Sequence, residues 1–297
     1  MTKQNSAALP ANNGLAPSLD AFLPNEMARK AENVGVKKAN LPLDKMFLLA
    51  VLAGAFIAMG AIFATTVSTG AADLPLGVGR LLTGIAFSLG LILVVIAGAE
   101  LFTGNNLVVM AMANRKISWS LMLKSWAVVY AGNFVGSLAT AIILFLSGQW
   151  KQGGGAIGVK ALEIANAKCS FGFVEAFFLG VLCNALVCLA IWLCFSARTT
   201  TDKILAIVPP ITAFVAAGFE HSIANMYFVP AGMLIKSFGG EAFFGSATMG
   251  TTELANLTWF GFLVNNLLPV TLGNIVGGSL LVGVVYWFIH LRGTTEE

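Results

Sequence analysis

Long apolar stretches without a charged side chain are the feature that most restricts how this chain can fold. No Asp, Glu, Lys or Arg stands between Lys45 and Asp73, from Ser125 to Trp150 or from Leu254 to Leu291. A helix needs about 20 residues to cross a hydrocarbon core of about 30 Å. Each stretch exceeds that length, so the sequence predicts helices that span a membrane.

The composition excludes an ordinary soluble protein. Of 297 residues, 57% are hydrophobic and 10% are charged, whereas a soluble domain carries about 25% charged residues. The mean hydropathy is +0.84. A net charge of +3, spread over such a chain, reflects how the chain is oriented in the membrane rather than a surface that binds phosphates. We therefore expect an integral membrane protein that does not bind nucleic acid.

Six spans are predicted, in an all-α membrane domain. The expected spans are Met46–Val67, Leu81–Ala99, Ser125–Trp150, Cys169–Ala197, Ile204–Phe219 and a segment within Leu254–Leu291. The second and fifth end in an acid, Glu100 or Glu220, after which a second short apolar run begins. These two spans are predicted to be broken inside the membrane. An even number of spans puts both termini on one side, and the excess of basic residues there makes that side the cytoplasm.

We expect a single channel domain over residues 46–292, with short flanking segments. Residues 1–19, rich in Ala, Asn, Pro and Ser, are expected to be disordered. Residues 20–45 are expected to form a cytoplasmic amphipathic helix and a linker, with 24–34 helical; this helix either rests on lipid or gates the pore. Loops such as 149–158 join the spans, and residues 293–297 form a C-terminal tail.

Three short matches recur in the same order and predict two inverted halves, residues 46–147 and 170–290. The matched pairs are Phe47–Gly54 with Phe173–Gly180, Gly98-Ala-Glu100 with Gly218-Phe-Glu220, and Gly132–Gly136 with Gly273–Gly277. A repeat of three spans must run in the opposite direction across the membrane. Broken backbone at mid-membrane is tolerated only beside protein or a watery cavity. The two breaks should therefore line a pathway.

His221, in the second break, is the leading candidate for a functional side chain. Ionisable groups inside a membrane are expensive and usually functional, and histidine changes charge near neutral pH. Thr103, in the first break, would either bind a solute or cap the half-helix that follows. Asn184 would hydrogen-bond His221 or a permeating species, or else hold helices together.

Glu100 and Glu220 are expected to have structural roles. Each carboxylate would tie down the broken backbone or pair with a base such as Lys168 or Lys124.

Two further symmetric pairs are predicted to shape the pathway. Asn133 and Asn274, each flanked by glycines, should mediate close helix packing rather than contact a solute. Phe87 and Phe214 precede the breaks and are candidates for hydrophobic constrictions.

The sequence contains no catalytic, cofactor or metal signature. Ser-His-Asp, HExxH, GxSxG and Walker patterns are absent, and the two histidines are far apart in the sequence. The cysteines, Cys169, Cys183, Cys188 and Cys194, lack a ligand spacing and are expected to be small buried hydrophobes. We expect neither an enzyme nor a cofactor.

From Phe22 to Arg292 the sequence resembles the formate/nitrite transporter family. The motifs that carry the resemblance are Gly84–Leu91 (GIAFSLGL), Gly98–Gly104 (GAELFTG), Gly218–Met226 (GFEHSIANM) and Pro269–Gly278 (PVTLGNIVGG). Glu100 stands where some members have Asp, a departure that keeps the acid.

The resemblance implies an aquaporin-like fold and a homopentamer in the bacterial inner membrane, with one pore in each protomer. It implies that His221 is the central pore histidine, hydrogen-bonded near Thr103 and Asn184. It places Phe87 and Leu91 at one constriction and Phe214 at the other. It further implies that Lys168 and Glu220 support a positive field that draws anions, and that the N-terminal segment gates with pH.

The function implied is pH-dependent movement of formate, with His221 protonating or pairing with the anion. A nitrite or hydrosulfide channel of the same architecture is the alternative. A neutral-solute pore of the aquaglyceroporin type is disfavoured because the sequence lacks the paired Asn-Pro-Ala breaks of such pores.

Overall fold

The computed structural model describes residues 20–246 and 254–293, and in these ranges every regular element is helical. The segment 1–19, expected to be disordered, and residues 294–297 of the expected tail lie outside the described residues.

Helices long and apolar enough to cross a membrane number six in the described ranges, which confirms the prediction. They are α2 (Leu43–Ser68), α3 (Leu76–Ala97), α6 (Trp119–Ser147), α8 (Phe173–Ser196), α9 (Thr200–Ala217) and Gly261–His290. The last runs continuously through Gly261–Leu267, α12 (Leu268–Ile275), Val276–Val284 and α13 (Val285–His290), with π-type hydrogen bonding before and after α12.

Apolar side chains cover much of the outer surface of these helices. Leu146 is 76% exposed, Val174 67% and Ile143 66%. Such a surface is stable against lipid or a neighbouring protomer, but not against water.

Shorter helices connect the long ones. They are α1 (Pro24–Ala39), α4 (Phe102–Asn105), α5 (Val109–Ala113), α7 (Ala156–Cys169), α10 (Ser222–Phe238) and α11 (Glu241–Ser246). Helix α1 thus continues beyond the expected residues 24–34. The prediction of a loop over 149–158 was wrong at its end, because α7 begins at Ala156. Gly153, Gly154 and Gly155 all have positive φ and turn the chain just before it.

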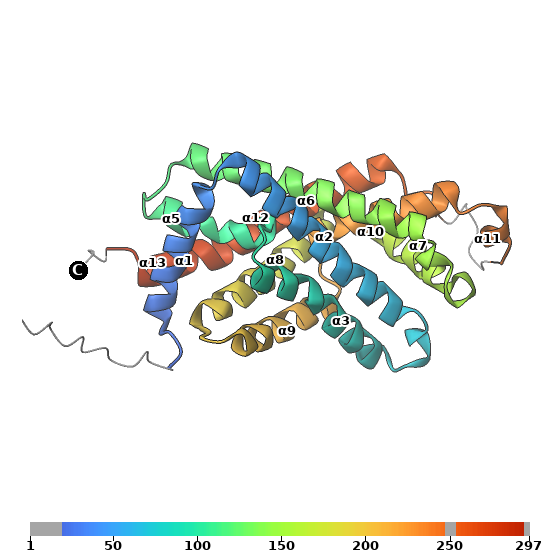
Figure 1. Ribbon diagram of the computed structural model, residues 1–297, viewed down its shortest axis with the longest axis horizontal. Coiled ribbons are helices and arrows are strands. Elements are labelled where there is room, and N and C mark those ends of the chain that lie inside the picture. The colour runs from blue at the N-terminus through green and yellow to red at the C-terminus, as the bar shows by residue number, and fades with distance from the viewer. Residues whose placement is uncertain (1–19, 247–253, 294–297) are drawn as a thin grey trace, which may run out of the picture.

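The two ends of the molecule carry different short helices (Figure 1). Helices α1, α5 and α13 lie at one end and α7 and α11 at the other. Between these ends α2 packs against α3 and α6, and α8 packs against α9 and α12. Helix α3 also packs along α9. The N-terminal helix and the C-terminal helix are therefore at the same end of the molecule.

Glycines allow the closest helix crossings. A Cβ added to Gly136 would overlap the carbonyl oxygen of Val51, and one added to Gly277 would overlap that of Val181. The backbones of α2 and α6, and of α8 and the last long helix, are therefore in direct contact.

Candidate functional site

Two interruptions in the helices form the centre of the site. Helix α3 ends at Ala97, and Gly98 (φ 83°) turns the chain before α4 begins at Phe102. Helix α9 ends at Ala217, and Gly218 (φ 77°) does the same before α10 begins at Ser222. Glycine adopts a positive φ without the penalty that a Cβ brings. Each interruption leaves backbone groups that need partners from elsewhere in the protein.

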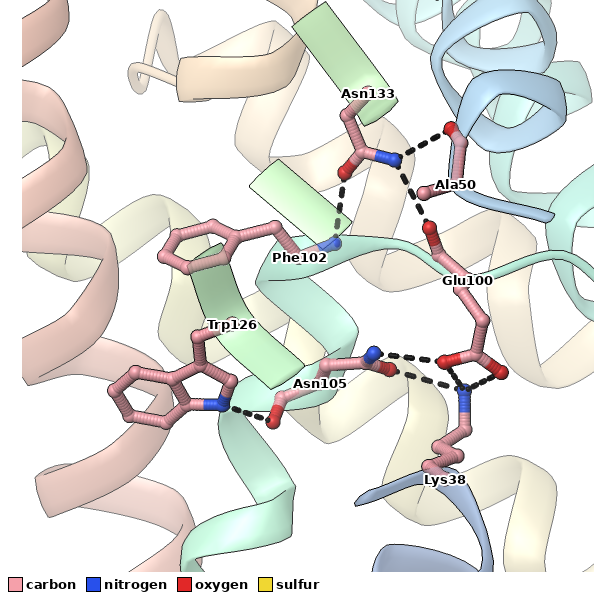
Figure 2. Close-up of polar contacts among 7 residues, drawn as sticks. All are labelled: Lys38, Ala50, Glu100, Phe102, Asn105, Trp126 and Asn133. Atoms are coloured by element: carbon pink, nitrogen blue, oxygen red, sulfur yellow. Dashed lines mark hydrogen bonds and ion pairs between the residues drawn. The ribbon is translucent and has the colours of Figure 1, made fainter. Parts of the chain in front are cut away.

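Asn133 satisfies the backbone at the first interruption (Figure 2). Its Oδ1 accepts a hydrogen bond from the Phe102 N–H at 2.9 Å. Its Nδ2 donates to the carbonyl oxygens of Glu100 at 2.9 Å and Ala50 at 2.7 Å. One buried side chain therefore holds both sides of the interruption to α2.

Asn274 does the same at the second interruption. Its Oδ1 accepts from the Ser222 N–H at 2.9 Å, and its Nδ2 donates to the carbonyls of Glu220 at 3.0 Å and Gly180 at 2.8 Å. The packing role expected for the two asparagines belongs to the glycines beside them. The amides themselves tie down the interrupted backbone.

These contacts pair different residues from the sequence match between the two predicted halves. Asn133 bonds Ala50 and Asn274 bonds Gly180, so Ala50 and Gly180 have equivalent hydrogen bonds. The sequence match that paired Gly54 with Gly180 is therefore displaced by about one helical turn. In apolar helices rich in Phe, Leu, Ala and Gly, a shift of one turn gives a similar number of matches.

Each interruption carries an acid paired with a lysine. Both carboxylate oxygens of Glu100 accept from Lys38 Nζ at 2.9 Å, and Asn105 Nδ2 donates to the same carboxylate at 2.7 Å (Figure 2). At the second interruption, Lys168 Nζ donates to Glu220 Oε1 at 2.7 Å. Asn225 and Asn266 donate to its Oε2 at 2.7 and 3.1 Å.

The lysine partners were predicted only in part. Lys168 pairs with Glu220, but Lys124 is exposed on α6 and is not the partner of Glu100. The partner is Lys38, near the end of α1. Its position in the chain parallels that of Lys168, because Lys38 lies as far before Ala50 as Lys168 lies before Gly180.

His221 and Thr103 join the two interruptions. Thr103 Oγ1 and His221 Nε2 are 3.0 Å apart, and both side chains are buried. His221 is also the residue that caps α10, because its Nδ1 accepts from the Ala224 N–H at 3.1 Å. A ring nitrogen that accepts carries no proton, so the neutral ring has its proton on Nε2 and donates it to Thr103. Thr103 therefore bonds His221 and does not cap its own helix.

Asn184 supports Thr103 rather than His221. Its Nδ2 donates to Asn106 Oδ1 and to the Asn274 carbonyl, both at 2.7 Å, and lies 3.3 Å from the Thr103 carbonyl. Cys188 Sγ is 3.3 Å from that same carbonyl. The expected bond from Asn184 to His221 is absent from the described residues because the amide donors are engaged elsewhere. Asn184 thus fixes the backbone that presents the Thr103 hydroxyl.

Two cavities of similar volume are lined by residues of this region: His221 lines one, and Leu101 and Gly104, close to Thr103 in the chain, line the other. The first, about 360 Å³, is lined by Lys38, Glu100, Leu91 and Leu101 among others. The second, about 350 Å³, is lined by Lys168, Glu220, His221, Phe87 and Phe214 among others. One acid–lysine pair therefore lines each cavity.

Phe87 and Phe214 lie together, which corrects the expected constrictions. Their ring centroids are 5.7 Å apart in an edge-to-face arrangement. Phe87 stacks on Phe228 at 6.4 Å and Phe214 on His221 at 5.9 Å. The prediction that grouped Phe87 with Leu91 and apart from Phe214 was wrong. Since α3 packs along α9, Phe87 faces Phe214, while Leu91, one turn further along α3, lines the first cavity.

Leu101 and Phe228 are lining residues that the sequence reasoning missed. Leu101 is 2% exposed and lines the first cavity beside Leu91. Phe228, on α10, lines the second beside Phe87. Leu101 directly precedes α4 at the first interruption, and that position could have singled it out. Nothing in the sequence distinguishes Phe228 among 22 phenylalanines.

The described residues hold no cluster of His, Cys, Asp or Glu that could bind a metal ion. The cysteines Cys169, Cys183, Cys188 and Cys194 are buried free thiols. The arrangement offers instead two cavities, the hydrogen-bonded Thr103–His221 pair and, in the wall of the second cavity, an aromatic layer formed by Phe87, Phe214 and Phe228.

The sequence model of the family described as formate/nitrite transporter matches residues 25–288. The chain is 44% identical to the formate channel FocA of Escherichia coli K12 over 273 residues, covering 92% of this chain and 96% of that protein. It is 42% identical to the formate channel FocA of Haemophilus influenzae, over 89% of this chain and 93% of that protein.

This chain is also similar to solved structures of channels. A pentameric formate channel with formate bound superposes with a TM-score of 0.80 at 48% identity, covering 84% of this chain and 98% of that chain. An ion channel of the FNT family superposes with a TM-score of 0.71 at 32% identity, covering 90% and 98%.

Proposed function

This chain belongs to the formate/nitrite transporter family, and we propose that it is a formate channel of a bacterial cytoplasmic membrane rather than an enzyme. The observation that carries the proposal is the Thr103–His221 hydrogen bond of 3.0 Å. His221 lines the cavity with Lys168 and Glu220, and Gly104, next to Thr103 in the chain, lines the cavity with Lys38 and Glu100.

The finer architecture is part of the proposal. The second and fifth spans are broken at Gly98 and Gly218, and the two three-span halves are inverted repeats of an aquaporin-like fold. The paired hydrogen bonds of Asn133 and Asn274 support this reading. By analogy with the pentameric neighbour, five protomers assemble in the lipid bilayer, each with its own pore. Both termini face the cytoplasm.

Charge is the obstacle that the pore must overcome. Moving an ion out of water into apolar surroundings costs several kcal/mol, and Phe87 and Phe214 present such surroundings. Lys168 and Lys38 attract an anion into the cavities, but they do not remove its charge. Formate carries a single negative charge, so one proton makes it neutral formic acid.

His221 supplies that proton in the proposed mechanism. At rest the ring is neutral, because Nδ1 accepts from the Ala224 N–H. A proton taken up from the water-filled cavity makes the ring cationic and displaces this hydrogen bond. The cation then pairs with the arriving formate or transfers its Nε2 proton to a formate oxygen. Transfer leaves a neutral imidazole and formic acid, which passes the aromatic layer uncharged.

Flux into proteoliposomes tests the proposal. We expect ¹⁴C-formate to enter vesicles containing the purified protein, with a rate that depends on pH and is inhibited by nitrite but not by glycerol. Nitrite or hydrosulfide flux well above formate flux would assign the alternative anion. Passage of glycerol without formate would replace the proposal with a neutral-solute pore.

A further inference from the structure

The charges that line the first cavity do not balance. Among the described residues, three lysines line it, Lys30, Lys38 and Lys203, and a single carboxylate, that of Glu100. Both oxygens of this carboxylate accept from Lys38. Lys30 and Lys203 are therefore left without an acid in the cavity wall.

Lys30 lies on α1 and is held with its charge largely uncompensated. Its Nζ donates to the Phe195 carbonyl at 3.1 Å and lies 4.5 Å from the centre of the Phe22 ring. An ammonium has three donors, and this bond uses one. Burial, followed by the nearby positive charges of Lys203 and Arg198, lowers the pKa of Lys30 below 10.5.

Lys203 approaches the same space from the first turn of α9. Its side chain is half-buried, and within the described ranges its Nζ makes neither a hydrogen bond nor an ion pair. The neighbouring acid, Asp202, is exposed and does not line this cavity; its carboxylate accepts from the backbone N–H groups of Thr199 and Arg198. Arg198 in turn lies over the Phe22 ring at 3.5 Å and donates to the Asp20 carbonyl.

We propose that Lys30 and Lys203 together bind one small monocarboxylate, such as formate, in the first cavity. The two oxygens of a carboxylate can accept from two ammonium groups at once, and the anion would neutralise their mutual repulsion. Apolar side chains, among them Val34, Val95 and Ile191, also line this cavity and would suit the hydrogen-bearing side of formate. This assignment rests on the proposed function for the identity of the anion.

The site differs in place and partners from the Lys38–Glu100 pair. Its lysines come from α1 and α9, whereas Lys38 is occupied by Glu100 and Asn105. Because Lys30 belongs to α1 and Lys203 to α9, the bound anion bridges the N-terminal helix to the channel domain. Without the anion, like charges oppose this contact.

A lysine footprint tests binding without any need for transport. The intact protein is treated with acetic anhydride in sodium formate or in sodium chloride at equal ionic strength, and modification of each lysine is measured by mass spectrometry. We expect formate to slow modification of Lys30 and Lys203 several-fold relative to chloride. Lys37, exposed on the same helix, should react equally in both salts. Equal reaction of Lys30 in both salts would overturn the carboxylate site.

Variants test its contribution to flux. Lys30→Met and Lys203→Met should each raise the half-saturating formate concentration about three- to tenfold on the side to which the first cavity opens. Lys30→Arg should retain most of the wild-type value, and Lys37→Met should match wild type. Unchanged half-saturation in both methionine variants would overturn the site. A wild-type protein that passes no formate would refute the proposed function instead, and the footprint would still decide the site.

Discussion

The two ring nitrogens of His221 have different partners, so different substitutions remove different interactions. Nδ1 caps α10 by accepting from Ala224, and Nε2 bonds Thr103. Asparagine is among the best capping residues, whereas phenylalanine has no acceptor.

His221→Asn should therefore keep the cap and lose the proton donor, while His221→Phe loses both. We expect His221→Phe to be less stable than His221→Asn by about 1 kcal/mol, measured as thermal unfolding of the detergent-solubilised protein. Both should alter the pH profile of formate flux. A wild-type profile in either variant would refute the proton role of His221, and equal stability would refute the cap.

Removal of Lys38 should destabilise the protein mainly because it leaves the buried Glu100 carboxylate without its cation. Glu100 is 7% exposed, and a buried carboxylate that loses its cation is strongly destabilising. Since the Lys38 side chain is 28% exposed, we expect Lys38→Met to lower stability by about 2 kcal/mol after allowance for solvent screening.

The double variant Lys38→Met with Glu100→Gln distinguishes charge from packing. Glutamine keeps a carbonyl oxygen for Asn105 and carries no charge, so the double variant should recover most of the lost stability. Failure to recover would show that the Lys38 stem, rather than its charge, supports the site. Thermal unfolding of the single and double variants gives this comparison directly.

At the scale of helices, α2 crosses α6 closely, and α8 crosses the last long helix closely. Both crossings depend on glycines, which have no side chain. A Cβ at Gly136 or Gly277 would meet backbone, which cannot rotate away as a side chain can. We expect Gly136→Ala and Gly277→Ala each to lower the unfolding temperature markedly and the yield of folded protein. Gly77→Ala on α3, where a Cβ meets nothing within 4 Å, should be neutral or slightly stabilising. Equal behaviour of the three variants would contradict the close crossings.

The helices themselves could be predicted from the sequence, but their register could not. Apolar length locates six spans because the bilayer fixes how long each must be. The terminal residues differ, as at α6, which begins at Trp119 and contains Lys124 near its start. A long basic side chain can extend its charge to the interface from inside a helix. Apolar repeats tolerate a shift of one turn, and the equivalent hydrogen bonds of Ala50 and Gly180 differ from the sequence match by about that amount.

At the scale of the whole molecule, some site residues are marked by a local sequence pattern and others are not. Glu100, Glu220, His221 and Thr103 stand at the interruptions, and a glycine followed by an acid inside an apolar run marks these positions in one dimension. Lys38 reaches the site from α1, and Phe228 lies further along α10; neither has such a signal. The grouping of Phe87 with Phe214 depends on which helices lie side by side, and the pairing of α3 with α9 emerges only from packing.

That pairing makes the aromatic layer a candidate for size selection. Phe214 contacts both Phe87 and His221, so the proposed path from the second cavity toward Thr103 passes it. A hydrophobic site can discriminate one additional methyl group by about tenfold or more. Phe214→Ala should therefore raise the ratio of acetate to formate flux in proteoliposomes about tenfold, and Phe214→Leu should raise it less. Phe178→Ala, at a ring 58% exposed on the outer surface of α8, serves as the matched control and should leave the ratio unchanged. If the ratio stays at its wild-type value in Phe214→Ala protein that folds normally, the aromatic layer does not select by size, and selection must lie at Leu91 and Leu101 on the other side of the Thr103–His221 pair.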